Sequence, residues 1–200
     1  MPKQLLNKSV LHRMQGQLAL YEKVLPPLDL KRQKLLAESA QAKKELRTLR
    51  ERQDAFNEET AGHYPMLLEQ TTGHRNLVRI AKVHETVRNV VGVRLPELVR
   101  VEFAPPGYSL LGTPAWSELL ARRMETAIAM ELESDFIRRR IWLLERSLKK
   151  VTQRVNLFEK VLIPETKAEI KKTVIALEEL HRSSVIRSKI AKAKHEKAES

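Results

Sequence analysis

Large apolar residues recur along residues 137–162 at alternating intervals of four and three residues. The mean period is about 3.5 residues, the repeat of helices that supercoil around a partner, whereas a lone amphipathic helix repeats every 3.6 residues or so. The positions outside this stripe are mostly charged or polar, so the segment needs a second helix to cover one narrow apolar face. The stripe consists of Ile137, Ile141, Leu144, Leu148, Val151, Val155, Phe158 and Leu162.

A second stripe with the same alternation runs through the first quarter of the chain. Its register passes unshifted across Pro26 and Pro27, which favours one kinked helix over two separate helices. Two such segments at opposite ends of one chain predict an intramolecular antiparallel coiled coil. The alternative, a surface helix on a globular core, is disfavoured by the polar remainder. The second stripe consists of Leu11, Met14, Leu18, Tyr21, Leu25, Leu28, Arg32, Leu35, Ser39, Ala42, Leu46, Leu49, Gln53 and Phe56.

The two stripes also suggest a register. We expect Phe56 to lie opposite Ile137, which would set Pro26 and Pro27 opposite residues 166–167 and within one helical turn of Pro164. A proline inside a helix leaves the carbonyl one turn earlier without its donor. The register therefore predicts a bend that both helices share at this level.

The middle of the chain has a different pattern. Residues 83–103 are rich in β-branched residues and partly alternate with polar ones, which predicts a two-stranded hairpin with residues 95–97 between the two runs. Two strands are marginally stable alone, so this hairpin should lean on the coiled coil or on a partner. Short helices are expected over 66–72 and 75–82, and the last long helix from Pro114.

These patterns together predict an all-α dominated fold. Its main part is a long antiparallel two-helix coiled coil formed by the N- and C-terminal segments, with a small central β-hairpin and short helices. The expected division is 1–60 for the N-terminal coiled-coil helix, 61–113 for the central short helices and β-hairpin, and 114–200 for the C-terminal coiled-coil helix, all within one structural unit.

Composition adds a bias toward acidic partners. Lys and Arg number 37 against 25 Asp and Glu, which gives a net charge of +12 and suits nucleic acid, anionic lipid or an acidic protein surface. The sequence has no cysteine, which excludes disulfides and fits a reducing compartment. It also has no run of 18 apolar residues, so we expect neither a membrane span nor a signal peptide.

Signatures of catalysis are missing from the sequence. It has no GxxxxGK[ST] phosphate-binding loop, and its six histidines form no HExxH pair. Adjacent carboxylates such as Glu58 and Glu59 are most simply solvated helix faces. We therefore expect no catalytic residue, no metal site and no cofactor.

Four short sequence motifs are spread over most of the chain. They are GQL at 16–18 leading into LDLKRQKL at 28–35, NVVGVRLP at 89–96, GYSLLGT at 107–113, and RVNLFEKVLIP at 154–164, of which the last is the most specific. In this order they resemble the D subunit, the central rotor stalk, of V-type and archaeal-type rotary ATPases. The pair Pro26-Pro27 is a feature in which the sequence resembles a bacterial subgroup of this family.

The resemblance implies a role as a shaft that transmits torque. In this family both termini form a coiled coil inside a hexamer of catalytic A and regulatory B subunits, while the middle contacts a small F-like stalk subunit and a rotor-cap subunit above the membrane ring. The shaft links ATP turnover to proton or sodium movement, and the catalytic groups belong to other subunits. The resemblance thus implies a cytoplasmic protein that is peripheral to the membrane as part of the complex, with no nucleic acid partner.

Candidate partner-binding residues follow from the family-like stretches and from the hairpin. They are Lys31, Arg32, Arg154, Asn156 and Glu159 in the coiled coil, and Val91, Val93, Arg94, Leu95, Val101 and Phe103 in the hairpin. Two alternatives stay open for the whole chain. One is a basic coiled coil that binds nucleic acid, and the other is a structural tether or adaptor.

Overall fold

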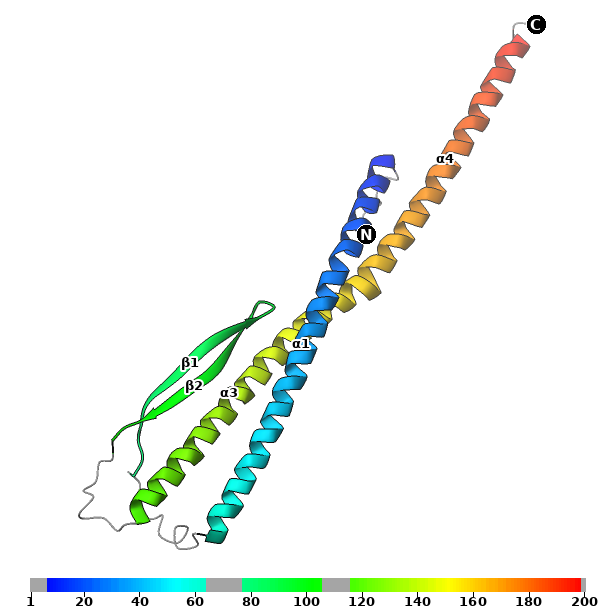
Figure 1. Ribbon diagram of the computed structural model, residues 1–200. Coiled ribbons are helices and arrows are strands. Elements are labelled where there is room, and N and C mark those ends of the chain that lie inside the picture. Colours follow the sequence, from blue (N-terminus) through cyan, green and yellow to red (C-terminus); the bar gives the residue numbers. More distant parts are fainter. Residues whose placement is uncertain (1–6, 64–76, 106–115, 199–200) are drawn as a thin grey trace. The chain divides into compact units, whose positions relative to one another are not determined.

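The computed structural model describes residues 7–63, 77–105 and 116–198. Along the sequence, one antiparallel hairpin lies between two long helical segments (Figure 1). The elements are α1 (Lys8–His63), β1 (Ile80–Val90), β2 (Val93–Phe103), α3 (Trp116–Leu157), the π-helical turn η2 (Phe158–Leu162) and α4 (Ile163–Ala198). This order confirms the predicted fold class. None of the helices, over the residues described, is long and apolar enough to cross a membrane.

The chain divides into two units. The central unit, Arg32–Lys150, contains the hairpin together with most of α1 and α3. The terminal unit joins Met1–Lys31 to Val151–Ser200, and so contains the start of α1, the end of α3, η2 and α4.

Helix α1 begins after a capping residue. The Asn7 carbonyl accepts the Leu11 N–H at 3.1 Å, and the Asn7 side chain accepts the Ser9 N–H at 3.4 Å. The helix then continues past Pro26 and Pro27 to His63. The prediction of one helix through the prolines is therefore confirmed, and the bend stays a prediction.

In the central unit, α1 and α3 pack along the predicted stripes. Arg140 of α3 reaches Glu45 of α1 at 2.8 Å, and Gln53 reaches Glu131 at 3.3 Å, so the pairing is antiparallel. The stripe positions of both helices are buried or half-buried, while their neighbours are mostly exposed. The most buried stripe residues are Leu35, Ser39, Ala42, Leu49, Ile137 and Leu144.

The register differs from the expected one. Phe56 lies beside Arg123, whose guanidinium carbon is 5.1 Å from the ring centre, instead of opposite Ile137. The stripe of α3 extends further toward its N-terminus than its large apolar residues indicate, because small or polar residues such as Ser134 occupy it. Ser134 is fully buried. The expected register was wrong because Ser134 and Arg123 are not apolar and hid this part of the stripe.

The terminal unit repeats the antiparallel pairing. The rings of Tyr21 and Phe158 meet edge to face at 5.5 Å, and Lys167 pairs with Glu22 at 2.9 Å. Lys167 therefore lies near Glu22, one turn before the prolines, and not opposite Pro26 and Pro27 as expected. Among the described residues of this unit, the buried ones are Met14, Val151, Val155, Thr166 and Thr173.

The hairpin confirms the predicted strands but turns at a different place. The turn lies at Val91–Gly92, whereas the predicted turn region lies inside β2, where Pro96 pairs with Val87. The helix expected over 75–82 is also wrong for its described part, because residues 77–79 are not helical and β1 begins at Ile80. The short helix expected over 66–72 and the helix start at Pro114 fall outside the described residues.

Candidate partner-binding surfaces

The tip of the hairpin is a tight turn with two positive φ angles. Val91 has φ of 50° and Gly92 has φ of 83°. The Asn89 side chain accepts the Gly92 N–H at 2.9 Å, which holds the turn closed. Glycine adopts this conformation freely, but a β-branched residue does so only with strain. The tip thus keeps a strained, 36% exposed valine where asparagine or glycine would be more stable.

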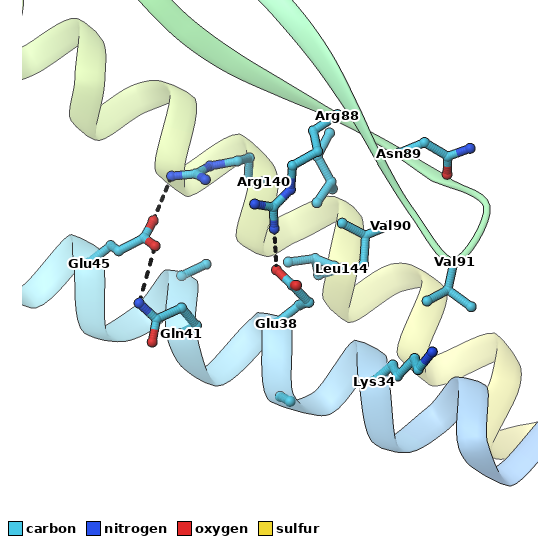
Figure 2. Close-up of a pocket in the computed structure, with 13 residues that line it drawn as sticks. Lys34, Glu38, Gln41, Glu45, Arg88, Asn89, Val90, Val91, Arg140 and Leu144 are labelled. Atoms are coloured by element: carbon cyan, nitrogen blue, oxygen red, sulfur yellow. Dashed lines mark hydrogen bonds and ion pairs between the residues drawn. The ribbon is translucent and has the colours of Figure 1, made fainter.

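One face of the hairpin is turned toward the coiled coil of the central unit. Leu95 is only 2% exposed and borders, with Ala42 and Leu144, a hollow of about 910 Å³ between the hairpin tip and the two helices (Figure 2). Val90 and Val91 line the same hollow. The hairpin therefore leans on the coiled coil, as expected, but the contact beneath its tip is not fully packed.

Ion pairs hold the hairpin over this hollow. Arg88 of β1 donates to Glu38 of α1 at 2.6 Å, and its Nε lies 3.4 Å from Glu97 of β2 (Figure 2 shows the pair with Glu38). Arg140 of α3 is 3.7 Å from Glu97 and 2.8 Å from Glu45. These five residues, which we call the hairpin latch, connect both strands with both helices.

Arg140 occupies the centre of the latch. Its side chain is only 17% exposed, so its charge is partly removed from water and is balanced by two carboxylates. Arg88 is 49% exposed, and its pair with Glu38 is correspondingly screened by solvent. Within the latch, the short Arg140–Glu45 pair joins the two helices, while the hairpin is held by the short but more exposed Arg88–Glu38 pair and the longer Arg140–Glu97 contact.

The outer face of the hairpin carries apolar side chains in water. Val87 is 59% exposed and Val99 is 62% exposed. Val99 is the extra residue of a β-bulge, because the pairing shifts between His84 with Arg100 and Glu85 with Leu98. A hairpin with one docked face and one exposed apolar face is suited to bind a further protein.

A small charge cluster lies farther from the tip. Nε2 of His84 is 2.9 Å from Glu102, and Arg100 lies 2.5 Å from the same carboxylate. The hydrogen bond from His84 lowers the pKa of Glu102, the charges of Arg100 and Lys82 contribute in the same direction, and burial opposes them. The cluster favours the ionised carboxylate and fastens the two strands to each other.

Antiparallel helix pairing between the N- and C-terminal segments of one chain, with a hairpin between them in the sequence, is what the family resemblance implied. The model of the ATP synthase D subunit family matches residues 10–193. The chain belongs to this family.

Named relatives support the same assignment. A V-type ATP synthase D subunit of Borreliella burgdorferi is 30% identical over 188 residues, which cover 94% of this chain and 93% of the relative. A protein of the same name in Chlamydia trachomatis serovar L2 is 38% identical over 56% of this chain and 55% of its own length. The one in Chlamydia muridarum is 40% identical over 54% of this chain and 53% of its own length. The predicted family, including its bacterial character, is confirmed.

The hairpin residues predicted to bind partners do not share one environment. Arg94 is exposed, Val91 lies at the tip, and Val93, Val101 and Phe103 are half-buried. Leu95 is buried against the helices, so it supports the hairpin and presents little surface to a further chain. The direct contacts of this member of the D-subunit family stay a prediction.

The predicted coiled-coil residues divide between the units. Arg154 and Glu159 are exposed in the terminal unit, where Asn156 and Lys31 are half-buried. Arg32 is half-buried in the central unit. The fold does not gather them into one cluster within either unit.

The latch was missed by sequence reasoning. Arg140 follows Arg138 and Arg139 and lies outside the apolar stripe, so the pattern of apolar residues does not single it out. The available signal was that Arg140 falls beside the stripe positions Ile137 and Ile141, at the edge where a partner helix passes. Within the described ranges no group of three or more histidines and carboxylates could hold a metal ion.

Proposed function

We propose that this chain is the central-stalk subunit of a V-type rotary ATPase and transmits torque between the nucleotide-processing hexamer and the ion-translocating ring of the membrane. The observation that carries the proposal is the family match over residues 10–193, which covers both coiled-coil helices and the hairpin. On this proposal the chain is non-catalytic, and it works on the cytoplasmic side, peripheral to the membrane.

The physical properties of the chain suit that role. Both helices of the pair belong to one chain, so dilution cannot separate them. The shaft surface is polar and basic, with a net charge of +12, and single exposed apolar residues are scattered along it. A shaft that turns inside a hexamer benefits from a surface without deep anchoring pockets, because tightly bound anchors would hold one orientation.

The division of labour along the chain is part of the proposal. Residues 1–60 and 114–200 form the shaft that enters the A and B subunits. Residues 61–113, with the hairpin, serve the F-like subunit, the rotor-cap subunit or activation of the hexamer. The exposed Val87 and the strained Val91 support an interaction role for the hairpin, because neither is explained by the stability of the hairpin alone.

Co-expression with the A-type, B-type, F-like and rotor-cap subunits of the same organism tests the proposal. We expect one complex whose ATPase activity requires this chain. Failure of the chain to copurify with any of them, or strong salt-dependent binding to duplex DNA instead, would contradict it and favour the nucleic-acid alternative.

A variant at the hairpin tip tests the assignment of the hairpin. Val91→Gly relieves about 1 kcal/mol of backbone strain and removes the exposed side chain, so the chain should stay folded while its affinity for the complex falls several-fold. Leu36→Ala, which truncates an exposed side chain of the proposed shaft, is the matched control when the F-like and rotor-cap subunits alone are the binding partners. Pull-down titration measures both, and equal affinity of Val91→Gly and wild type would remove Val91 from the interface.

A further inference from the structure

The π turn η2 makes the last long helical segment irregular at one place. The Ile163 N–H bonds to the Phe158 carbonyl, five residues earlier, where an α-helix would use the carbonyl four residues earlier. Such a turn holds one residue more than an α-helical turn. On either side, α3 and α4 are regular α-helix.

The extra residue changes which positions face α1 in the terminal unit. If the alternation that ends at Leu162 continued in an α-helix, the next stripe positions would be Glu165, Glu169 and Lys172. All three are exposed. The buried positions are Thr166 and Thr173, each one residue later.

The stripe after η2 is therefore the same heptad, moved along by one residue. Ile170 and Leu177 follow the moved register and are half-buried. If residues 158–166 formed an ordinary α-helix with no widened turn, three charged side chains would enter the contact with α1, each of them costly to bury without a partner. The sequence beyond residue 162 thus requires the π turn.

The ring and the missing N–H of Pro164 also favour an irregular turn at this place. Proline cannot donate to the carbonyl of Lys160, and in an α-helix its ring would clash with that carbonyl. A widened turn that ends just before Pro164 relieves this clash. Two independent features of the sequence, the moved heptad and Pro164, therefore meet at η2.

The contacts around η2 leave the turn itself lightly held. Tyr21 contacts Phe158 at the start of the turn, and Glu22 pairs with Lys167 beyond its end. No residue of η2 is buried, and Val161 is 39% exposed. On α1, Pro26 and Pro27 follow these two contact residues within about one turn, so both helices have weakened backbone hydrogen bonding here.

We propose that η2 is a torsional joint of the terminal unit, in which one supernumerary residue separates two regular coiled-coil stripes. Twisting α4 relative to the end of α3 changes the widened hydrogen bonds of η2 before it disturbs the packed residues on either side. The mechanical use of this joint under torque rests on the proposed rotor function, but its existence can be tested on the isolated full-length chain.

Excision of the extra residue is the decisive test. Deleting Val161 and replacing Pro164→Ala aligns Ile163, Thr166 and Ile170 with the upstream heptad as one continuous α-helix. We expect the melting temperature to stay equal or rise. The matched control deletes Arg139, an exposed residue between the stripe positions Ile137 and Ile141. This deletion should lower the melting temperature by about 5 °C or more, because Ile141 and the residues after it leave the seam.

Hydrogen exchange locates the effect. In the wild-type chain the amides of 159–163 should exchange about 10-fold faster than those of the last two turns of α3. Excision should abolish the difference, whereas Pro164→Ala alone should keep it because the extra residue remains. The proposal is overturned if wild-type exchange is uniform, or if the excision variant melts as early as the Arg139 deletion.

The assembled ATPase tests the mechanical role separately. Single-molecule rotation of a complex that contains the excision variant should show smaller angular fluctuation of the shaft than wild type, and equal fluctuation would overturn the torsional role. A wild-type chain that joins no ATPase complex would count against the proposed function and would leave the exchange and melting results standing.

Discussion

The coiled-coil seam and the hairpin contact are both interfaces within the central unit, but they are held by different forces. Along the seam, Leu35 and Leu49 of α1 and Ile137 of α3 are at most 3% exposed. Under the hairpin tip, Leu95 is buried, but a hollow of about 910 Å³ remains and charged pairs such as Arg88 with Glu38 span the contact. The seam is a packed apolar core, and the hairpin contact is a charged latch.

This difference separates the stability of the two parts. Burial of apolar side chains contributes a few kcal/mol for each large residue, whereas a partly exposed ion pair contributes about 1 kcal/mol or less. The hairpin can therefore open at a small fraction of the free energy of unfolding of the helix pair. A shaft that must stay rigid while one of its parts engages another subunit benefits from this separation.

The largest effect should come from breaking the seam. Leu35→Ala removes a fully buried side chain and should lower the free energy of unfolding by about 2–5 kcal/mol. The neighbouring Leu36 is 59% exposed, so Leu36→Ala should change stability by about 0.5 kcal/mol or less. Urea unfolding followed by circular dichroism measures both. Similar losses for the two variants would contradict the packing of the seam.

The seam could be predicted from the sequence because period and burial are directly linked. Each large apolar residue of the two stripes marks a buried or half-buried position, and the strands of the hairpin follow from their β-branched residues. The prediction stopped at Ile137 because the stripe continues through Ser134 and Arg123, whose side chains carry no hydrophobic signal. The register error for Phe56 followed from this stop.

The irregular and charged features could not be predicted in the same way. The large apolar residues alone do not locate the π turn, because the moved stripe begins with Thr166 and repeats at Thr173, and threonine does not mark a stripe. The latch depends on which charged side chains face each other across three elements, as Arg140 faces Glu45 and Glu97. The turn at Val91–Gly92 was hidden because valine rarely adopts a positive φ.

A medium effect should come from opening the latch. Glu38→Gln removes the partner of Arg88 on α1 and should raise the exchange rate of hairpin amides up to about 5-fold, with little change in the melting of the helices. A cycle with Arg88→Gln isolates the coupling between the two residues. Hydrogen exchange of β1 and β2 is the measurement.

Glu118→Gln is the matched control for the latch. Glu118 also binds an arginine at 2.6 Å, but its partner Arg122 lies one turn later on the same helix α3. Its loss should leave hairpin exchange unchanged. If both variants loosen the hairpin equally, or neither does, the latch does not hold the hairpin on the helices.

The smallest effect concerns pH and the strand pairing of the hairpin itself. The pKa of Glu102 is lowered chiefly by the hydrogen bond from His84, with Arg100 and Lys82 adding to it, so folding favours the carboxylate. A group whose pKa is lowered in the folded state contributes its stability above the unfolded pKa of about 4.3 and loses it as pH falls through the lowered value. Acidification below about pH 4 should therefore loosen this end of the hairpin.

Glu102→Gln should flatten this dependence, because glutamine does not titrate. The effect is the smallest of the three, since the Glu102 side chain is 42% exposed and salt screens its charge. Chemical-shift titration of the Glu102 carboxyl and exchange of the β1 amides between about pH 3 and 6 measure it, at low and at high salt. A carboxyl of Glu102 that titrates at or above the ordinary glutamate value would contradict the contact with His84. Among the described residues, the Arg88–Glu97 contact of the latch would then be the only ion pair that joins β1 to β2.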